Sequence, residues 1–319
     1  MSKTVTPPAH DDRACPVCGD RRGTVYAEAN LDRSRLDDFA YSSRKTPEYM
    51  HHRLLECPVC RLLYASPLPD EQELASGYGA AAFDSSTESR CAAATYARYL
   101  ESFLDRLPDR QGALDIGTGD GAFLEQLQAL GFTDCAGVEP SRAPIAAARA
   151  GVRHLIRQGM FRAGDFAPGS FSLITCFQTL EHLSDPAALV AGAWRLLKPG
   201  GALYTVCHDR HSLSARILGS RSPIFDIEHL QLFSPASTRV LLESQRFTSV
   251  DIAPLVNRYP LRYWLRLIPL PRVAKQYAIS LADRTGLGSV SLAVRAGNLA
   301  AVGFKPQAPP PSPLQGARP

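Results

Sequence analysis

The segment 114–121, LDIGTGDG, restricts the possible folds of this chain more than any other stretch. Apolar residues typical of a strand run into three closely spaced glycines, and residues 122–130 then have the apolar spacing of a helix. Glycine permits a tight turn and close approach of a ligand, and the free N–H groups of the next helix suit a carboxylate or a ribose edge. Gly117, Gly119 and Ala122 also match the dinucleotide-binding pattern, and such a turn can lack any ligand, so this segment alone leaves the ligand open.

Strand-like and helix-like segments alternate through the middle of the chain. Alternation at this spacing is typical of β-α-β units, which form a parallel sheet covered by helices on both faces. Right-handed crossovers place the ligands of such a sheet at the carboxyl ends of its strands. The sequence therefore predicts an α/β fold with strands at 113–116, 135–138, 171–177 and 202–207, and helices at 92–107, 122–130, 144–150 and 186–197.

Length and composition exclude several classes of protein. At ~150 residues per domain, 319 residues suggest about two domains. With 45% hydrophobic and 21% charged residues, the chain is not wholly disordered, collagen-like or a disulfide-dense miniprotein. It has no apolar run long enough for a transmembrane helix, and residues 1–20 lack the apolar core of a secretory signal. We therefore expect a cytoplasmic protein with reduced thiols.

Three further segments decide between the ligand alternatives. Glu139, in GVEPS, lies about twenty residues after the glycine loop, where an acid can accept hydrogen bonds from both hydroxyls of a ribose. The other two are 171–183, which ends in QTLEHL, and 196–203, which contains LLKPGG. In this order, DIGTGDG, GVEPS, SLITCFQTLEHLSDP and LLKPGG resemble the class I S-adenosylmethionine-dependent methyltransferases over about residues 110–207.

This resemblance implies a Rossmann-like sheet of seven strands with a reversed last strand. Residues 298–305 would supply the last strand and residues 250–255 the one before it. Where the family often has an acid beside the adenine, this chain has Met160 and Phe161, which would pack the ring instead. Asp165 is an alternative only if the loop is shifted.

The resemblance also implies a site for S-adenosyl-L-methionine. The glycine loop would pass under the methionine part of the cofactor, Asp115 would brace the loop, and Glu139 would hold the ribose hydroxyls. Phe177 and Gln178, at the end of a strand, would lie beside the sulfonium. The residues assigned to the cofactor are Asp115, Gly117, Thr118, Gly119, Gly121, Glu139, Pro140, Phe161, Phe177 and Gln178.

Two CPVC tetrapeptides, at 15–18 and 57–60, predict a metal site. Two such knuckles can bring four thiolates to one tetrahedral Zn²⁺, whereas a redox pair or a disulfide does not explain why the knuckle occurs twice. Many bacterial methyltransferases of this kind begin with a similar zinc module, although Arg61 stands here where glycine is usual. We expect a structural zinc without a catalytic role, held by Cys15, Cys18, Cys57 and Cys60.

These segments predict the domain organisation. A disordered N-terminus, 1–13, precedes a zinc-ribbon-like module, 14–70. The methyltransferase domain covers 90–305 and contains a basic, aromatic insertion at about 256–297. A proline-rich tail, 306–319, is expected to be disordered.

Candidate catalytic residues follow from the chemistry of methyl transfer. The reaction is an in-line displacement, so the enzyme mainly aligns the nucleophile with the methyl group, and a hydroxyl or carbanion nucleophile also needs a base. Glu181 and His182 follow the strand 171–177, His229 lies on a later loop, and His208 closes the strand 202–207. The candidates are His182, His229 and Glu181, with helix capping or a lid brace as the structural alternative.

The insertion is strongly basic. From residue 252 to the end there are nine Lys or Arg and one acid. On a helix, Arg258, Arg262 and Arg266 would share one face, and Pro260 and Pro269 limit that helix to about two turns. The insertion binds an anionic substrate, lies on an anionic membrane surface, or is a solvated cap. Nucleic-acid binding is disfavoured because no recognition motif accompanies the basic residues.

The predicted function is methyl transfer from S-adenosylmethionine to a small-molecule acceptor, or to one linked to a sugar or a lipid. If the insertion lies on an anionic membrane surface, the protein would contact the inner face of the membrane peripherally. One alternative is an NAD-type nucleotide-dependent oxidoreductase or epimerase built on the same sheet. Another is a non-enzymatic zinc-ribbon interaction protein with a degenerate cofactor domain, against which the intact glycine loop and Glu139 argue.

Overall fold

The computed structural model describes residues 12–32, 49–70, 85–268 and 270–307, together with the single residues 34, 72, 74, 77 and 83. The predicted N-terminal tail therefore lies outside the described residues except for its last two positions, and the proline-rich tail except for its first two. Among the described residues, no helix combines the length and the apolar character needed to cross a bilayer.

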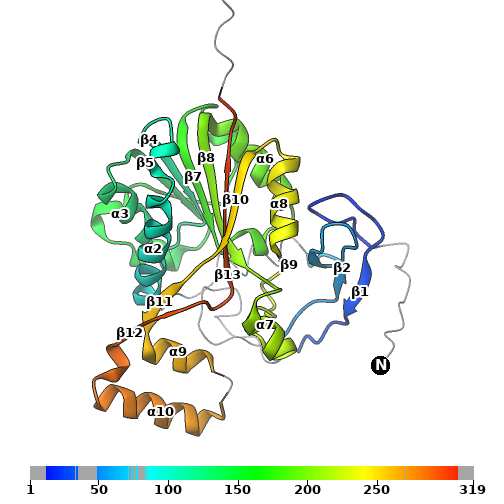
Figure 1. The fold of residues 1–319 in the computed structure, drawn as a ribbon, viewed down its shortest axis with the longest axis vertical. Helices are drawn as coiled ribbons and strands as arrows, with labels where there is room; N and C mark the ends of the chain where they lie inside the picture. The colour runs from blue at the N-terminus through cyan, green and yellow to red at the C-terminus, as the bar shows by residue number, and fades with distance from the viewer. Residues whose placement is uncertain are drawn as a thin grey trace, which may run out of the picture.

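A seven-stranded sheet forms the centre of the molecule, in the order β10-β13-β8-β7-β4-β5-β6 (Figure 1). The strands from β8 to β6 pair in parallel, and β13 runs antiparallel to both of its neighbours. This topology confirms the predicted fold class, including the reversed last strand. The strands are β4 (Gln111–Ile116), β5 (Thr133–Glu139), β6 (Ile156–Gln158), β7 (Phe171–Phe177), β8 (Leu197–His208), β10 (Thr248–Pro254) and β13 (Asn298–Phe304).

Helices cover both faces of this sheet (Figure 1). One core contains apolar residues of α2 (Ser86–Glu101) and α3 (Ala122–Ala129), and the other contains those of α6 (Pro186–Leu196) and α8 (Pro235–Ser244). Each helix of the second pair begins with proline after a side-chain cap, a combination typical of helix starts. The remaining short helices are α4 (Arg142–Ala147), α5 (Ala150–Arg153), α7 (Leu213–Leu218), η2 (Leu104–Arg106), η3 (Ala163–Asp165), η4 (Leu180–His182) and η5 (Gly219–Arg221).

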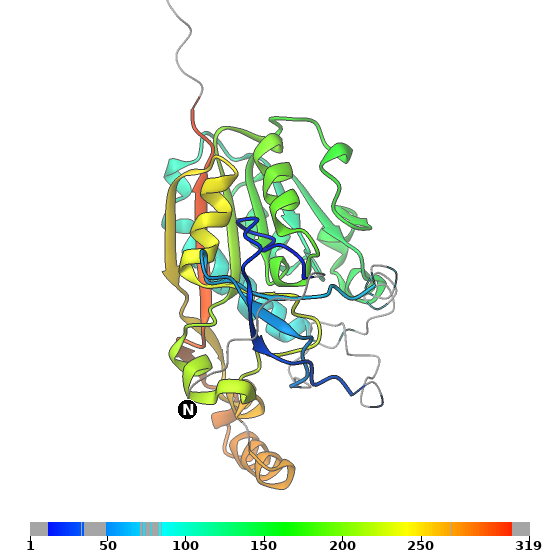
Figure 2. The ribbon, with the colours of Figure 1, turned by 90° about the vertical axis from the view of Figure 1, so that its right-hand side faces the viewer.

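The N-terminal segment adds a second, small sheet against the α6 and α8 face (Figure 2). Its strands are β1 (Thr24–Ala27), β2 (Leu54–Glu56) and β3 (Leu63–Ala65), and β9 (Gln231–Leu232) completes it in the order β1-β2-β3-β9. The fourth strand thus comes from a part of the chain far away in sequence. The small sheet therefore shares both its core and a strand with the larger part of the molecule.

The basic insertion forms a helical hairpin on a two-stranded stalk between β10 and β13 (Figure 1). The prediction of one helical face shared by three arginines is wrong for Arg258, which lies on β11, because the residue before Pro260 is held extended and the helix begins only after that proline. Arg262 and Arg266 lie on α9. The elements are β11 (Asn257–Pro260), α9 (Leu261–Leu267), α10 (Arg272–Arg284), η6 (Leu287–Ser289) and β12 (Ser291–Val294).

Candidate active site

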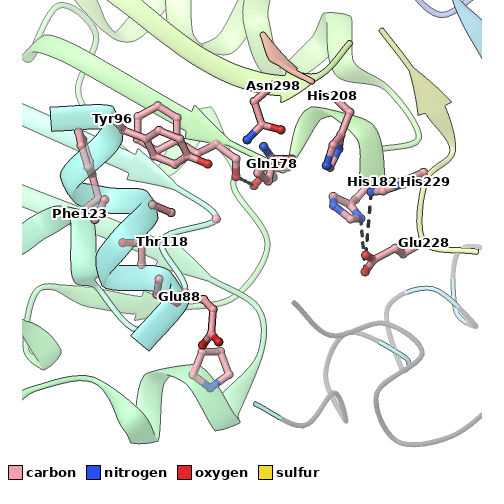
Figure 3. A pocket seen from close by; sticks show the side chains of 18 of the residues that line it. Glu88, Tyr96, Thr118, Phe123, Gln178, His182, His208, Glu228, His229 and Asn298 are labelled. Carbon is pink, nitrogen blue, oxygen red and sulfur yellow. Dashed lines mark hydrogen bonds and ion pairs between the residues drawn. The ribbon is translucent and has the colours of Figure 1, made fainter. Parts of the chain in front are cut away.

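A cavity of about 1120 Å³ opens at the carboxyl ends of the central strands (Figure 3). The glycine loop and the end of β5 form one side of its wall, where ligands bind in sheets of this topology. His182, His208 and His229 line the opposite part, together with the insertion. Of the ten residues assigned to the cofactor from the sequence, all except Gly121 line this cavity.

The glycine loop is held in a conformation that other residues rarely adopt. Gly117, Gly119 and Gly121 have φ angles of +75°, +57° and +72°. A Cβ atom on Gly117 would lie 2.2 Å from Oγ1 of Thr179, whereas the space around Gly119 is open. Gly121 is the N-cap of α3 and has Val152 beside it. Tight packing therefore determines the loop on one side, and the cavity borders it on the other.

Two buried carboxylates fix the shape of this loop. Glu139 accepts hydrogen bonds from the backbone N–H groups of Gly119 and Ser141, both at 2.9 Å, and burial raises its pKa. Asp115 accepts one from Oγ1 of Thr175 at 2.6 Å, and burial raises its pKa to about 6. Each carboxylate oxygen keeps a lone pair for a further donor. The pair therefore fits a ligand with hydroxyl and ammonium groups, as S-adenosylmethionine has.

The predicted adenine side of the cavity is apolar. Met160 and Phe161 line it, next to Pro140. Asp165, the alternative that required a shifted loop, is exposed and does not belong to the lining. The arrangement suits a flat apolar ring.

The end of β7 lies between the two parts of the cavity (Figure 3). The ring of Phe177 packs against Tyr96 and Phe123, with centroids 4.5 and 4.7 Å away. Gln178 has a φ angle of +48°, an unusual conformation for a residue other than glycine. Its Oε1 atom is buried without a hydrogen-bond partner in the described part of the chain. Strain and an unpaired polar atom at one position are typical of functional sites.

Three histidines gather around two glutamates in the other part of the cavity (Figure 3). The ring of His229 lies 5.1 Å from that of His182 and 5.1 Å from that of His208. Glu181 is fully buried behind them and does not line the cavity. It accepts a hydrogen bond from the backbone N–H of His208 at 2.6 Å, and Nδ1 of His208 lies 3.2 Å from the same oxygen.

Burial and mutual repulsion keep two of these imidazoles neutral. Burial, together with His229, lowers the pKa of His182 to about 3, and burial with His208 lowers that of His229. Burial opposes ionisation of Glu181, but hydrogen bonding to His208 and the nearby histidines outweigh it and lower its pKa. At neutral pH the site therefore has a carboxylate and two imidazoles with available lone pairs.

The segment that carries His229 is anchored at both of its edges. Nδ1 of His229 lies 2.8 Å from the carbonyl of Ile224, so the ring donates through this atom. The next residue, Leu230, donates to the carbonyl of Glu181 at 2.8 Å and accepts from Ala65 at 2.7 Å. Ala65 belongs to β3, so the small N-terminal sheet helps to position a cavity histidine.

The four knuckle cysteines converge as predicted. Their Sγ atoms lie within 4.8 Å of one another, with Cys15 to Cys60 at 3.5 Å and Cys18 to Cys57 at 3.4 Å. None of the four forms a disulfide, and the hydrogen bond with Cys60 lowers the pKa of the Cys15 thiol to about 5. This donor set fits a tetrahedral Zn²⁺.

Both knuckles close in the same way. Gly19 donates to the carbonyl of Cys15 at 2.9 Å, and Arg61 donates to that of Cys57 at 3.0 Å. Their φ angles are +75° and +64°. Arg61 thus adopts the left-handed conformation of the glycine that it replaces, and the turn is unchanged.

Several cavity residues were missed by reasoning from the sequence. Tyr96, Asn257 and Asn298 carry no motif, and they meet only because the insertion folds back over the strand ends. Glu228 stands beside His229 in the chain, which was the one available signal for it. From the insertion, Tyr259, Tyr263, Trp264 and Arg295 also line the cavity.

Residues 89–251, just over half of the chain, match the model of a family described as a methyltransferase domain. A similar relative is the ubiquinone biosynthesis O-methyltransferase of Thiobacillus denitrificans, 30% identical over 46% of this chain and 71% of the relative. The enzyme of the same name from Methylococcus capsulatus is 32% identical over 55% of this chain and 66% of the relative. The match to the Pseudomonas aeruginosa enzyme of the same name covers 28% of this chain and 41% of that protein.

Two solved structures are also similar. One is a possible histamine N-methyltransferase from Thermotoga maritima, with 20% identity, coverage of 68% of this chain and 90% of that one, and a TM-score of 0.45. The other is the geranyl diphosphate C-methyltransferase of Streptomyces coelicolor. It is 18% identical, the match covers 66% of this chain and 79% of that one, and the TM-score is 0.43. The family match favours the methyltransferase over the oxidoreductase and non-enzymatic alternatives, and the chain belongs to the S-adenosyl-L-methionine-dependent methyltransferases.

Proposed function

We propose that this chain transfers the methyl group of S-adenosylmethionine to a hydroxyl of a small-molecule acceptor, including one linked to a sugar or a lipid. The observation that carries this proposal is one continuous cavity, which has the carboxylate-braced glycine loop at one end and the histidine cluster at the other. The three O-methyltransferase relatives support oxygen as the nucleophile.

In this proposal the two ends of the cavity have different tasks. When bound, the cofactor supplies an electrophilic methyl group on a sulfonium. Asp115 and Glu139 hold the loop and the ribose, while Phe161 and Pro140 pack the adenine. Phe177 and Gln178 border the path of the methyl group.

The histidines would receive the proton of the acceptor hydroxyl. His229 is the better candidate, because donation from Nδ1 to Ile224 leaves the lone pair on Nε2. His182 is a second candidate on the same wall. Glu181 acts through His208 and is therefore a positioning residue. A neutral imidazole within the cavity meets the need of a hydroxyl nucleophile for a base.

The walls of the cavity between α2 and the histidines suit an acceptor with an apolar body and a polar end. Tyr259, Tyr263 and Trp264 supply the aromatic part of the wall, and Arg295 supplies one positive charge. We therefore favour the first interpretation of the insertion, contact with the acceptor, for the stalk and α9.

For α10 we propose peripheral contact with an anionic membrane. Val273, Tyr277 and Leu281 form a stripe at four-residue spacing with exposed fractions of 80%, 71% and 51%. Apolar side chains beside Lys275 and Arg284 are typical of helices that lie on anionic lipid. Val273→Ser with Tyr277→Ser should reduce sedimentation with phosphatidylglycerol vesicles severalfold, whereas Leu31→Ser, an exposed leucine in the N-terminal segment, should not.

We also infer that the four cysteines hold a structural Zn²⁺ and that the protein works where thiols stay reduced, as in the cytoplasm. Support comes from the convergence of four unpaired thiols. Zinc measured by mass spectrometry in protein purified without chelator tests the metal.

Calorimetry with S-adenosylhomocysteine, with NAD⁺ as the control ligand, tests the cofactor assignment. Glu139→Ala should weaken S-adenosylhomocysteine binding by ~1–3 kcal/mol, the scale for loss of a buried hydrogen-bonding partner. Asp165→Ala is the matched control, because that acid is exposed outside the cavity. Equal affinities for the two variants would overturn the role of Glu139. Transfer of labelled methyl groups to hydroxylated prenyl-aromatic and sugar compounds then tests the acceptor class.

A further inference from the structure

One cluster in the cavity has the composition of a metal site. His182, Glu228 and His229 each offer one ligand atom, and these atoms lie within 4.8 Å of one another. Nδ1 of His182 and Nε2 of His229 are each 3.9 Å from a carboxylate oxygen of Glu228 (Figure 3). Atoms bound to one ion at ~2.0–2.2 Å are roughly 3.0–3.6 Å apart, so side-chain movements of a few tenths of an ångström to at most about 1.8 Å would complete the contacts.

The imidazole of His229 is oriented for coordination. A metal-bound histidine commonly donates its other ring N–H to a backbone carbonyl, which fixes the tautomer. His229 does this toward Ile224 at 2.8 Å, with Nε2 on the side of Glu228.

We propose that His182, Glu228 and His229 bind one divalent transition-metal ion at the wall of the acceptor part of the cavity. Two imidazoles and one carboxylate suit Mn²⁺, Fe²⁺ or Zn²⁺ better than Mg²⁺ or Ca²⁺, which prefer oxygen ligands alone. All three side chains line the cavity, so the remaining coordination positions face it.

This site differs from the cysteine site in ligands and in openness. The four thiolates close a tetrahedron, whereas three ligands leave positions for oxygen atoms of a bound molecule. The consequence for the acceptor rests on the proposed function: a hydroxyl bound to the ion would lose its proton more easily, and His182 and His229 would then hold the ion instead of taking the proton. An acceptor with adjacent oxygen atoms is the class favoured by such a site.

Titration with Mn²⁺, followed by electron paramagnetic resonance of the free ion, tests the proposal on the whole chain. Four thiolates bind Mn²⁺ only weakly, so the cysteine site does not interfere. The wild type should bind one ion, and Glu228→Gln, which keeps the size of the side chain, should weaken binding at least about tenfold. His211→Ala is the control, because this histidine is exposed and outside the cavity.

A second measurement tests whether the site binds Zn²⁺, which sites of this ligand type generally hold more tightly than Mn²⁺. Mass spectrometry of zinc-loaded protein should give two ions in the wild type and one in Glu228→Gln or His229→Ala. Absence of Mn²⁺ binding together with a single zinc, or binding unchanged in Glu228→Gln, would overturn the proposal. Calorimetry with S-adenosylhomocysteine without added metal separates the two ideas, because the proposed function requires that binding and the metal site does not.

Discussion

The cofactor part and the acceptor part of the cavity are built in different ways. The first is assembled within residues 115–178, from loops that follow adjacent parallel strands, so the sheet brings its members together. The second collects His208 from β8, His229 from the loop before β9, and the aromatic side chains of an insertion between β10 and β13. One part is therefore determined by local sequence and common topology, and the other by contacts between segments distant in the chain.

The acceptor part depends on a fragile element. β9 contains two residues and, within the described part of the chain, pairs with β3 of the small sheet alone. Arg210 adds a second link, because it donates to the carbonyl of Arg61 at 2.8 Å, just after the second knuckle. A strand of two residues has no stability of its own, so the position of His229 depends on the order of the cysteine knuckles.

Loss of the cysteine site should have the largest effect, and it should affect the acceptor part of the cavity much more than the cofactor part. In Cys15→Ser with Cys57→Ser we expect loss of bound zinc, loss of methyl transfer by at least about 100-fold, and S-adenosylhomocysteine affinity within about threefold of wild type, because a structural zinc supplies folding energy of its own domain. Zinc analysis, rate assays and calorimetry measure the three quantities. Cys91→Ser is the control for loss of a thiol. Parallel loss of cofactor affinity and rate would mean that the small sheet supports the whole molecule.

The same contrast explains what the sequence could predict of the fold. The strand 171–177 was predicted residue for residue, because β7 is mostly apolar and buried on both faces. β6 was missed, since it has three residues, two of them exposed, and therefore no hydrophobic pattern. β9 was missed because its two residues acquire a partner only through β3.

The candidate site was predictable to the same extent. Glu139 and Gln178 could be named because they stand at fixed distances from motifs and follow strands of a common topology. Tyr96 and Asn257 could not, since nothing in the sequence says that α2 and the stalk of the insertion meet at one cavity. Glu181 was predicted beside His182 and lies behind the wall, because the short helix η4 turns its side chain toward His208.

Substitutions in the glycine loop test how tightly the cofactor part is determined. Gly117→Ala would bring a Cβ to 2.2 Å from Thr179, at a φ angle of +75°, whereas Gly119→Ala meets open space at +57°. Backbone strain is common to both, so the difference isolates the clash. By calorimetry we expect S-adenosylhomocysteine affinity to fall roughly 100-fold for Gly117→Ala and roughly tenfold for Gly119→Ala. Similar losses would indicate that the loop moves away from Thr179 and is less rigid than proposed.

The buried carboxylate of Asp115 should lower the free energy of unfolding when it is ionised. Burial raises the pKa of Asp115 from 3.8 to about 6, so the stability contributed by its protonated form is complete below about pH 4 and is lost as the pH rises through 6. Asp115→Asn should therefore raise the free energy of unfolding by about 2–3 kcal/mol at pH 8 and leave it unchanged at pH 3.5. Urea unfolding at the two pH values measures this. An equal effect at both pH values would assign it to packing, and S-adenosylhomocysteine should bind more weakly in either case.

The smallest expected effect lies in the second knuckle, which supports the acceptor part. Arg61 adopts a φ angle of +64° with a side chain, whereas its counterpart Gly19 adopts +75° without one. Arg61→Gly should raise the melting temperature of the zinc-loaded protein, because relief of roughly 1–2 kcal/mol of strain exceeds the loss of an exposed ion pair with Glu56, worth about 0–1 kcal/mol. Gly19→Ala, the reverse change at the matching position, should lower it. A fall in both variants would show that the Arg61 side chain contributes more to the link with β9 than its backbone costs.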